Sequence, residues 1–397
     1  MTPRRLILVS EHYEPSSGAT AQLMHDLSYG FANNGWTVIV LTATSTDSAV
    51  DASNPCSVVR LGEQQRAADA NKTVAGKTLA GLLFALSCLL WCSRQSKQGD
   101  VMLIVSNPPF IGVIGLLLKL LRRLSYVFLF QDLFPRSAVL SGVLPRQGLA
   151  TQAWHRLMQT VCEHSAATVV LNQSMARRLA GETQKPLPLR VIHNWAIEQG
   201  SGSPRSSNEF ALQHNFQGQF TVQYSGNFGR LHDIETLIAS ASILKNDPLI
   251  QFLFIGGGQK QQVIEKAKLS NVLLLPYQPR QQLPETLAAC DLACISLIAG
   301  AEDTMAPCKL YGILASGRGL VLIAKPNCDL AQLVQQERIG IVVSPGESQH
   351  LAQQLKALSD APDEVAAMGQ RAKRLYYERF GFERSLLQYD QLLRSIR

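Results

Sequence analysis

Short, almost wholly apolar runs recur along the chain, and each is followed by a turn of small or polar residues. Leu6–Ser10 is the first of these runs, and Leu320–Ala324 is among the last. Runs of this kind are typical of strands that are buried on both faces, as in a parallel sheet covered by helices. Because segments with helical spacing lie between many of the runs, we predict an α/β fold.

The predicted strands fall into two groups. They are Leu6–Ser10, Trp36–Ala43, Ser57–Leu61, Val101–Ser106, Tyr126–Phe130, Ala167–Leu171 and Arg190–Ile192 in the first half, and Phe220–Ser225, Ile250–Ile255, Val272–Leu275, Leu292–Ser296, Leu320–Ala324 and Ile339–Val343 in the second.

The length of 397 residues is too great for one compact core, and a hydrophobic content of 46% argues for a well-buried globular protein. The strand pattern runs through residues 1–196, stops in a segment rich in Gly, Ser and Asn at 197–218, and restarts at 219–377. We therefore predict two Rossmann-like domains joined by a linker. A last helix, within residues 378–397, is expected to pack back toward the first domain.

The chain carries a formal net charge of +7, which suits a nucleic acid, an anionic membrane surface or a phosphate-bearing substrate. It contains no run of five Lys or Arg residues and no alternation of arginines with aromatic residues, so no nucleic-acid partner is expected. The eight cysteines form no CxxC pair and no Cys/His spacing that suits a metal. Because the apolar core of the first fifteen residues is too short for a signal peptide, we expect a cytoplasmic protein.

The stretch from residue 299 to residue 324 predicts a loop, a helix, a tight turn and a strand. Lys309 adds a positive charge to the first helical turn, where free N–H groups already favour a phosphate. Glu302 and Asp303 stand just ahead of that turn as acceptors for hydroxyl groups. This arrangement suits a sugar nucleotide, and an ordinary crossover with a solvated acidic loop is the alternative.

Other turns would also let a ligand approach the backbone. Gly226–Arg230 follows the first strand of the second half, and Gly256–Gly258 follows the next strand. In the first half, Ser16–Ala19 is a small-residue turn without the GxGxxG pattern of a dinucleotide site. Asn107 and Asp132 follow two further strands. Because parallel strands collect their ligand loops at the carboxyl edge, these loops are expected to face one cleft.

Two segments of the first half, Thr78–Cys92 and Phe110–Leu121, are apolar on all sides and carry basic residues at their ends. The first segment is short for a transmembrane span. It is either a fully buried core helix or a helix whose apolar face enters a membrane surface. A second segment of the same kind in a basic protein favours attachment to the membrane surface.

Six segments in their order along the chain resemble the retaining glycosyltransferases of the GT-B fold in family four. They are EHYEPSSGATAQLMHDL at 11–27, SNPPF at 106–110, QDLFPRSAVLSGVL at 131–144, HNW at 193–195, YSGNFGRLHDIETL at 224–237 and APCKLYGILASGR at 306–318. The similarity covers essentially the whole chain and points to bacterial enzymes of O-antigen, capsule and colanic-acid assembly. It implies two Rossmann-like domains that face each other across a cleft.

The resemblance implies that the C-terminal half holds a nucleotide diphosphate sugar, with uridine as the expected base. Arg230 and Lys309 would neutralise the charge that grows on the leaving diphosphate, and Glu302 would accept hydrogen bonds from sugar hydroxyls. These are the implied catalytic residues, and no metal or other cofactor is required. The implied donor-binding residues are Gly226, Asn227, Gly229, Gly256, Gly257, Asp303, Thr304 and Tyr311.

The resemblance also implies that the N-terminal half carries the acceptor. Because of the two apolar segments with basic ends, we expect this acceptor to be a lipid-linked saccharide at the inner face of the plasma membrane. The implied acceptor-side residues are His12, Gly18, Ala19, Asn107 and Asp132. The implied reaction moves a hexose or an N-acetylhexosamine with retention of configuration, and the leaving phosphate assists deprotonation of the acceptor hydroxyl.

The chain departs from the family at several positions, two of which concern the binding of ribose. Many members carry two glutamates eight residues apart, the second of which binds ribose hydroxyls; here the two positions are Thr304 and Gly312. How ribose is bound therefore stays open. A glycine inside a helix costs roughly 1 kcal/mol relative to alanine, so we expect a ligand or a helix to pack closely against Gly312.

Two other functions fit parts of the pattern. A sugar-nucleotide epimerase of the same fold would need acid/base groups concentrated in the cleft, where only His12 and Asp132 qualify. A non-catalytic assembly partner on a decayed transferase fold would explain the missing glutamates, although Arg230 and Lys309 are present. The sequence does not indicate the oligomeric state.

Overall fold

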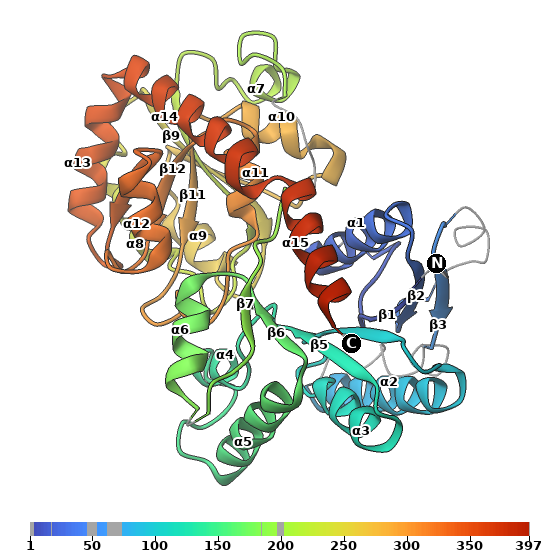
Figure 1. The fold of residues 1–397 in the computed structure, drawn as a ribbon. Helices are drawn as coiled ribbons and strands as arrows, with labels where there is room; N and C mark the ends of the chain where they lie inside the picture. Colours follow the sequence, from blue (N-terminus) through green and yellow to red (C-terminus); the bar gives the residue numbers. More distant parts are fainter. Residues whose placement is uncertain are drawn as a thin grey trace. The chain divides into compact units, whose positions relative to one another are not determined.

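The computed structural model describes residues 4–16, 18–45, 54–61, 74–183, 185–196 and 202–396. The chain forms two compact units, each with its own sheet and helices (Figure 1). The first unit extends from the N-terminus to His193 and also contains residues 304–306 and 383–397. The second unit contains residues 194–303 and 307–382. Both sheets are parallel throughout, which confirms the predicted fold class of two Rossmann-like halves.

The sheet of the first unit has seven strands in the order β3-β2-β1-β4-β5-β6-β7. They are β1 (Arg5–Val9), β2 (Thr37–Thr42), β3 (Ser57–Arg60), β4 (Val101–Val105), β5 (Ser125–Leu129), β6 (Ala167–Val170) and β7 (Leu189–Val191). The central strands β1, β4 and β5 are almost wholly buried, as expected of parallel strands covered on both faces. The strand order reverses between β1 and β4.

The helices of the first unit are α1 (Ala19–Asn33), α2 (Val74–Gln95), α3 (Gly112–Arg122), α4 (Arg136–Leu140), α5 (Leu149–His164), α6 (Gln173–Gly181) and, from Glu383 on, α15 (Phe382–Ser395). Several side-chain hydrogen bonds hold the last helix, and two of them link it to the end of α1 and the start of β2. The indole N–H of Trp36 donates to Asp390 at 2.6 Å, and the guanidinium of Arg394 donates to the carbonyl of Asn34 at 2.9 Å. The last helix of the chain thus belongs to the same compact unit as the first strand.

The sheet of the second unit has six strands in the order β10-β9-β8-β11-β12-β13. They are β8 (Phe220–Asn227), β9 (Ile250–Gly257), β10 (Val272–Leu275), β11 (Leu292–Ser296), β12 (Gly319–Ile323) and β13 (Gly340–Val343). Here the strand order reverses between β8 and β11. The core of this unit includes Phe252 and Phe254 of β9 and Leu351 and Leu355 of a covering helix, α13.

The helices of the second unit are α7 (Glu209–Gln213), α8 (Glu235–Ile243), α9 (Gln261–Ala267), α10 (Leu283–Ala288), α11 (Lys309–Ala315), α12 (Asp329–Gln336), α13 (Ser348–Ser359), α14 (Pro362–Leu375) and a π-helical turn (Tyr376–Phe380). Of the predicted linker at 197–218, residues 197–201 lie outside the described residues. The remainder contributes to the core of the second unit, because Phe210 and Phe216 are buried against Leu253 and Ile255 of β9.

Each predicted strand is present, with ends within two residues of the prediction. Helix α5 was not predicted. Its buried residues, Thr151, Met158, Val161 and Cys162, lie at helical spacing, so the signal for this helix was present in the sequence. Strand positions were easier to predict because buried parallel strands are apolar on both faces.

Helix α2 is longer and less buried than predicted from Thr78–Cys92. It has 22 residues, and Gly76–Gln95 is long and apolar enough to cross a membrane, the one such segment among the described residues. Phe84, Cys88 and Cys92 are buried on one face, whereas four leucines on another face are 46–56% exposed. These are Leu79, Leu82, Leu86 and Leu90. The interpretation of this segment as a fully buried core helix is therefore wrong.

Candidate functional site

The point at which the strand order of the second unit reverses gathers most of the predicted donor-side residues. In open parallel sheets, ligands bind outside the carboxyl ends of the strands at such a point. The loop after β8 contains Arg230, and the loop after β11 contains Glu302 and leads into α11 at Lys309. The three predicted catalytic residues therefore follow adjacent strands of one sheet.

Two glycine turns expose the backbone at this edge. Gly226 and Gly256 are paired at the ends of β8 and β9, and their φ angles are +127° and +138°. A Cβ atom on Gly256 would lie 2.0 Å from the carbonyl oxygen of Gly226, so only glycine fits there. The N–H of Phe228 donates to the carbonyl of Gly257 at 2.9 Å and holds the two turns together. The result is a fixed stretch of glycine backbone at this edge of the sheet.

The ammonium of Lys309 faces this stretch of backbone. A Cβ atom on Gly226 would lie 3.4 Å from Lys309 Nζ, and Nζ itself lies 3.7 Å from the centre of the Tyr224 ring. Nζ is buried, and no residue in the described part of the chain forms a hydrogen bond with it. An ammonium has three donors, and leaving them buried without acceptors is unfavourable.

Burial lowers the pKa of Lys309 to about 8, and Cys308 and Cys294 oppose part of that change. The side chain is still mostly protonated at neutral pH. Helix α11 has only seven residues, so its dipole adds little beside this full charge. The tight turn predicted after this helix contains Gly317, which adopts the left-handed conformation with φ +67°.

His232 is a neighbour of this site that the sequence analysis missed. Its Nδ1 lies 2.9 Å from the carbonyl oxygen of Ser296, so Nδ1 carries the proton and Nε2 is an acceptor. Burial and the charges of Lys309 and Lys260 lower the pKa of His232 to about 4, against the opposing effect of that hydrogen bond. The ring is neutral at pH 7. A histidine two residues after Arg230, inside a glycine-turn motif, was the available signal.

The carboxylate of Glu302 is buried and held by its own loop. One oxygen accepts the N–H of Gly300 at 2.6 Å, and the other accepts the N–H of Lys325, just after β12, at 3.0 Å. These bonds fix the position of the carboxylate without using all of its lone pairs. Asp303, the next residue, is partly exposed.

Arg230 is exposed at the same edge, and its Nε donates to Oε1 of Gln259 at 2.6 Å. Gln259 directly follows the three glycines after β9, so the two glycine turns are also linked through their side chains. Asn227 lies over Gly229 and Gly258, since Cβ atoms on these glycines would be 2.9 Å and 2.5 Å from its side-chain amide.

Of two predicted donor-binding residues, Tyr311 is buried and Thr304 belongs to the other unit, and the close packing expected at Gly312 is absent. Tyr311 is buried, its ring centre is 5.7 Å from that of Phe380, and burial raises the pKa of its hydroxyl. Thr304 belongs to the first unit, where its carbonyl accepts the N–H of Leu133 at 2.7 Å. A Cβ atom on Gly312 would meet only Leu287, at 3.9 Å, so the expected close packing of a helix there is wrong.

The predicted acceptor-side residues belong to the first unit, and most flank its own strand-order reversal. His12 lies in the loop after β1, and Asn107 lies in the loop after β4. The two loops touch, because the N–H of Glu11 donates to the carbonyl of Asn107 at 3.4 Å. Gly18 and Ala19 form the N-terminus of α1. The structure therefore brings these four residues to one edge of the sheet.

Asp132 follows β5, the next strand of the same sheet, and pairs with Met305 in a backbone bridge. The residue is open to solvent, yet desolvation by the surrounding protein raises the pKa of its carboxyl to about 6. A carboxyl of this kind exchanges protons near neutral pH, which suits a group that contacts an acceptor hydroxyl.

The site in the second unit combines two glycine turns, a neutral histidine and a buried ammonium that has no hydrogen-bond partner among the described residues. This combination suits an anion such as a phosphate or a diphosphate. In the part of the chain that the structure describes, no group of three His, Cys, Asp or Glu side chains is placed to hold a metal ion.

Comparison with known proteins agrees with this division. Residues 18–195 match the glycosyl transferase 4-like domain, and residues 207–375 match glycosyl transferases group 1. Over 265 residues the chain is 28% identical to the probable glycosyltransferase WbjE of Pseudomonas aeruginosa, covering 66% of each chain. Over 129 residues it is 34% identical to the putative colanic acid biosynthesis glycosyl transferase WcaI of Escherichia coli, covering 31% of each. The matched residues thus span less than two thirds of either relative.

The fold also matches a solved structure over its whole length. HepE from Anabaena, in complex with UDP and glucose, superimposes with a TM-score of 0.75 and 15% sequence identity, covering 99% of this chain and 100% of HepE.

Replacing Lys309 by methionine is expected to stabilise the fold. The folded pKa of about 8 lies below the ordinary value of 10.5, so the unfolded state binds the extra proton between these pH values. The cost of the buried charge is full below pH 8 and fades toward pH 10.5. We expect Lys309→Met to raise the free energy of unfolding by on the order of 2 kcal/mol at pH 7, with a smaller gain at pH 10.

Urea unfolding at pH 7, 8, 9 and 10 measures this difference. The matched control is Lys266→Met, which alters an exposed lysine of α9 and should shift stability little at any pH. Parallel pH profiles for wild type and Lys309→Met would show that the ammonium is not desolvated.

Proposed function

Because the chain belongs to the GT-B glycosyltransferases of family four, we propose that it transfers a hexose or an N-acetylhexosamine from a uridine diphosphate sugar to a lipid-linked saccharide. One observation carries the proposal. The buried ammonium of Lys309 faces the glycine turn after β8 and finds no hydrogen-bond partner among the described residues. A bound diphosphate would supply both the acceptors and the counter-charge.

The comparisons support the class of donor and the biological setting of this proposal. HepE, which shares the fold, is described in complex with UDP and glucose. WcaI carries a name that refers to colanic acid biosynthesis. We therefore propose a role in the assembly of a cell-surface polysaccharide such as an O-antigen or a capsule, on the cytoplasmic side of the plasma membrane.

The proposed chemistry places growing negative charge beside fixed positive charge. The bond between the anomeric carbon and the diphosphate oxygen breaks, and its electron pair moves to that oxygen. Lys309 and Arg230 would stabilise the leaving diphosphate, and His232, which is neutral at pH 7, adds no charge of its own. The acceptor hydroxyl attacks the same face of the sugar and passes its proton to the leaving phosphate, so configuration is retained. The carboxylate of Glu302, already held by the backbone N–H groups of Gly300 and Lys325, would accept a hydrogen bond from a sugar hydroxyl with its remaining lone pairs.

In the first unit, His12, Gly18, Ala19, Asn107 and Asp132 are proposed to contact the acceptor. With a pKa of about 6, Asp132 would be mostly ionised at pH 7 and could accept a hydrogen bond from an acceptor hydroxyl.

The lipid-linked part of the proposal is supported by α2 and α3. The exposed leucines of α2 recur at helical spacing, and Leu120 and Leu121 at the end of α3 are also exposed. The ends of these two helices carry exposed basic residues: Lys77 and Arg94 near the ends of α2, and Arg122 and Arg123 at the end of α3. Basic residues around an exposed apolar face suit the headgroup region of an anionic bilayer.

We propose that α2 lies along the membrane surface. A transmembrane position would expose Phe84, Cys88 and Cys92, which are now buried in the first unit. Interfacial binding requires no such rearrangement, because the leucines of the opposite face are already open.

Removing either proposed diphosphate partner should slow the transfer. We expect Arg230→Ala and Lys309→Ala each to lower turnover on the order of a hundredfold, as the loss of one transition-state charge partner does. The assay measures release of the nucleoside diphosphate from a panel of uridine diphosphate sugars in the presence of a short prenyl-diphosphate-linked sugar. Lys266→Ala, a change to an exposed lysine outside the site, serves as the control. Near-normal turnover in both test variants contradicts the assignment, and conversion of the donor without release indicates an epimerase.

We also propose that the reaction needs no divalent metal ion, since Lys309 and Arg230 can neutralise the leaving group. Turnover should therefore change little after dialysis against EDTA. Loss of activity that magnesium or manganese restores would show that the charge is neutralised in another way.

Membrane attachment should depend on the basic end of α3. Each Lys or Arg near an anionic surface contributes about 1 kcal/mol, so Arg122→Glu with Arg123→Glu should weaken binding at least about thirtyfold. Co-sedimentation with vesicles of phosphatidylglycerol and phosphatidylethanolamine at low salt measures the effect. Lys266→Glu with Lys268→Glu reverses two exposed charges of the second unit and is the matched control. If the wild type stays in the supernatant, the attachment proposal is wrong.

A further inference from the structure

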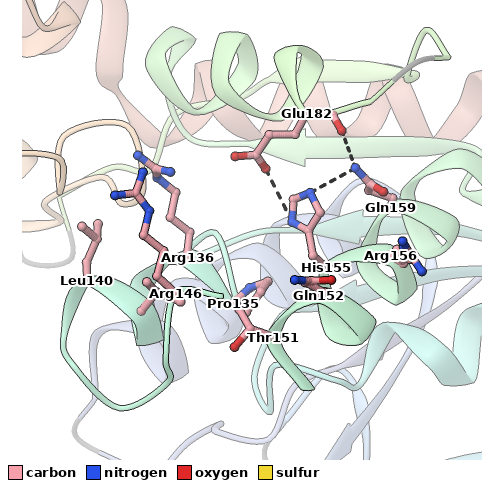
Figure 2. A pocket seen from close by; sticks show the side chains of 11 residues that line it. Pro135, Arg136, Leu140, Arg146, Thr151, Gln152, His155, Arg156, Gln159 and Glu182 are labelled. Carbon is pink, nitrogen blue, oxygen red and sulfur yellow. Dashed lines mark hydrogen bonds and ion pairs between the residues drawn. The ribbon is translucent and has the colours of Figure 1, made fainter. Parts of the chain in front are cut away.

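A second candidate binding site lies within the first unit. Helix α4, helix α5 and the end of α6 enclose a cavity of about 800 Å³ (Figure 2). This volume lies in the range of small-ligand sites. Part of the cavity's lining, including Pro135 and Arg136, comes from the segment 131–144, which does not contribute to the candidate donor site.

Three arginines line the cavity: Arg136 from α4, Arg146 from the turn before α5, and Arg156 from α5. In Figure 2, Arg136 and Arg146 extend side by side in the same direction. Neither Arg146 nor Arg156 forms an ion pair with a carboxylate of the described residues, and both are exposed. Guanidinium groups present flat pairs of N–H donors that match the oxygens of phosphate groups.

The single carboxylate in the lining, that of Glu182, is already engaged. Its Oε1 lies 2.7 Å from Nε of Arg178, and its Oε2 lies 3.8 Å from Nδ1 of His155. Nε2 of His155 lies 3.0 Å from the side-chain nitrogen of Gln159, which also donates to the carbonyl of Glu182. The polar side chains of Glu182, His155 and Gln159 therefore bind one another, and the arginines leave the cavity with a positive charge for a ligand.

The cavity also has apolar surroundings. Val139 and Leu140 of α4 contribute to its lining. Val143, in the connection between α4 and α5 that also carries Arg146, is 50% exposed, and Leu149, the first residue of α5, is 84% exposed. Exposed apolar side chains next to a cluster of guanidinium groups suit a ligand that joins an anionic group to a hydrocarbon chain.

We propose that this cavity binds the diphosphate group of a prenyl-diphosphate-linked acceptor, with the start of the prenyl chain on Val143 and Leu149. The inference rests on the proposed function, because a lipid-linked saccharide is the acceptor considered there. It adds the anchoring group and the residues that hold it. Arg136, Arg146 and Arg156 are binding residues in this inference and take no part in bond breaking.

The test is isothermal titration calorimetry of the full chain with farnesyl diphosphate, inorganic pyrophosphate, farnesol and UDP. The test variant is Arg146→Gln with Arg156→Gln, since both side chains are exposed and their loss should not unfold the protein. The matched control is Arg190→Gln with Arg374→Gln, two exposed arginines outside the cavity. We expect the test variant to bind farnesyl diphosphate about tenfold to a hundredfold more weakly than wild type, and the control to bind it normally. UDP should bind all three proteins alike.

Several results would overturn the inference. Equal affinity of wild type and test variant for farnesyl diphosphate removes the arginines from its binding. If farnesol binds as tightly as farnesyl diphosphate, the anionic group does not contribute to binding. If pyrophosphate binds as tightly as farnesyl diphosphate, the hydrocarbon chain does not contribute, and the cavity is a site for a soluble anion. If any of these occurs while UDP binds normally, the inference alone fails. If UDP does not bind the wild type, the proposed function fails with it.

Discussion

The buried ammonium of Lys309 is the constraint on which the ligand site of the second unit depends. It is placed by α11, packed over the ring of Tyr224, and directed at a turn where only glycine fits. Burying a charge without acceptors is tolerated in a stable fold when a ligand later supplies them, and active sites commonly carry such strain. Burial is the main cause of the lowered pKa of His232, and the charge of Lys309 lowers it further.

The parallel sheets explain why this cation and its neighbours meet. In both units the strand order reverses at one point, and the loops that follow the two adjacent strands leave the sheet there. In the second unit these loops carry Arg230 and Glu302; in the first they carry His12 and Asn107. The same topological feature therefore occurs in both units and gives each of them one edge that is suited to a ligand.

The surface of the first unit has a different chemical character from the donor-side edge of the second. Its exposed leucines on α2, its basic end of α3 and its arginine-lined cavity all combine apolar and cationic groups. These features lie on one compact unit, and an acceptor that is half lipid and half phosphosugar would use all of them. The glycine turns of the second unit instead suit a small, strongly anionic ligand.

The residue types of short segments were enough to predict the positions of the strands and of the glycine turns. Buried parallel strands such as β1 must be apolar on both faces, and turns with positive φ must contain glycine, so strands and glycine turns could be located from residue types alone. The burial of individual side chains and their contact partners could not be predicted in this way, because they depend on which distant segments the sheet order makes adjacent. Such long-range neighbours decide that Lys309 has no hydrogen-bond partner among the described residues, that His232 lies near it, and that Tyr311 packs into the interior. The same holds for α2, where only the packing of the unit shows which face of an apolar helix is left open.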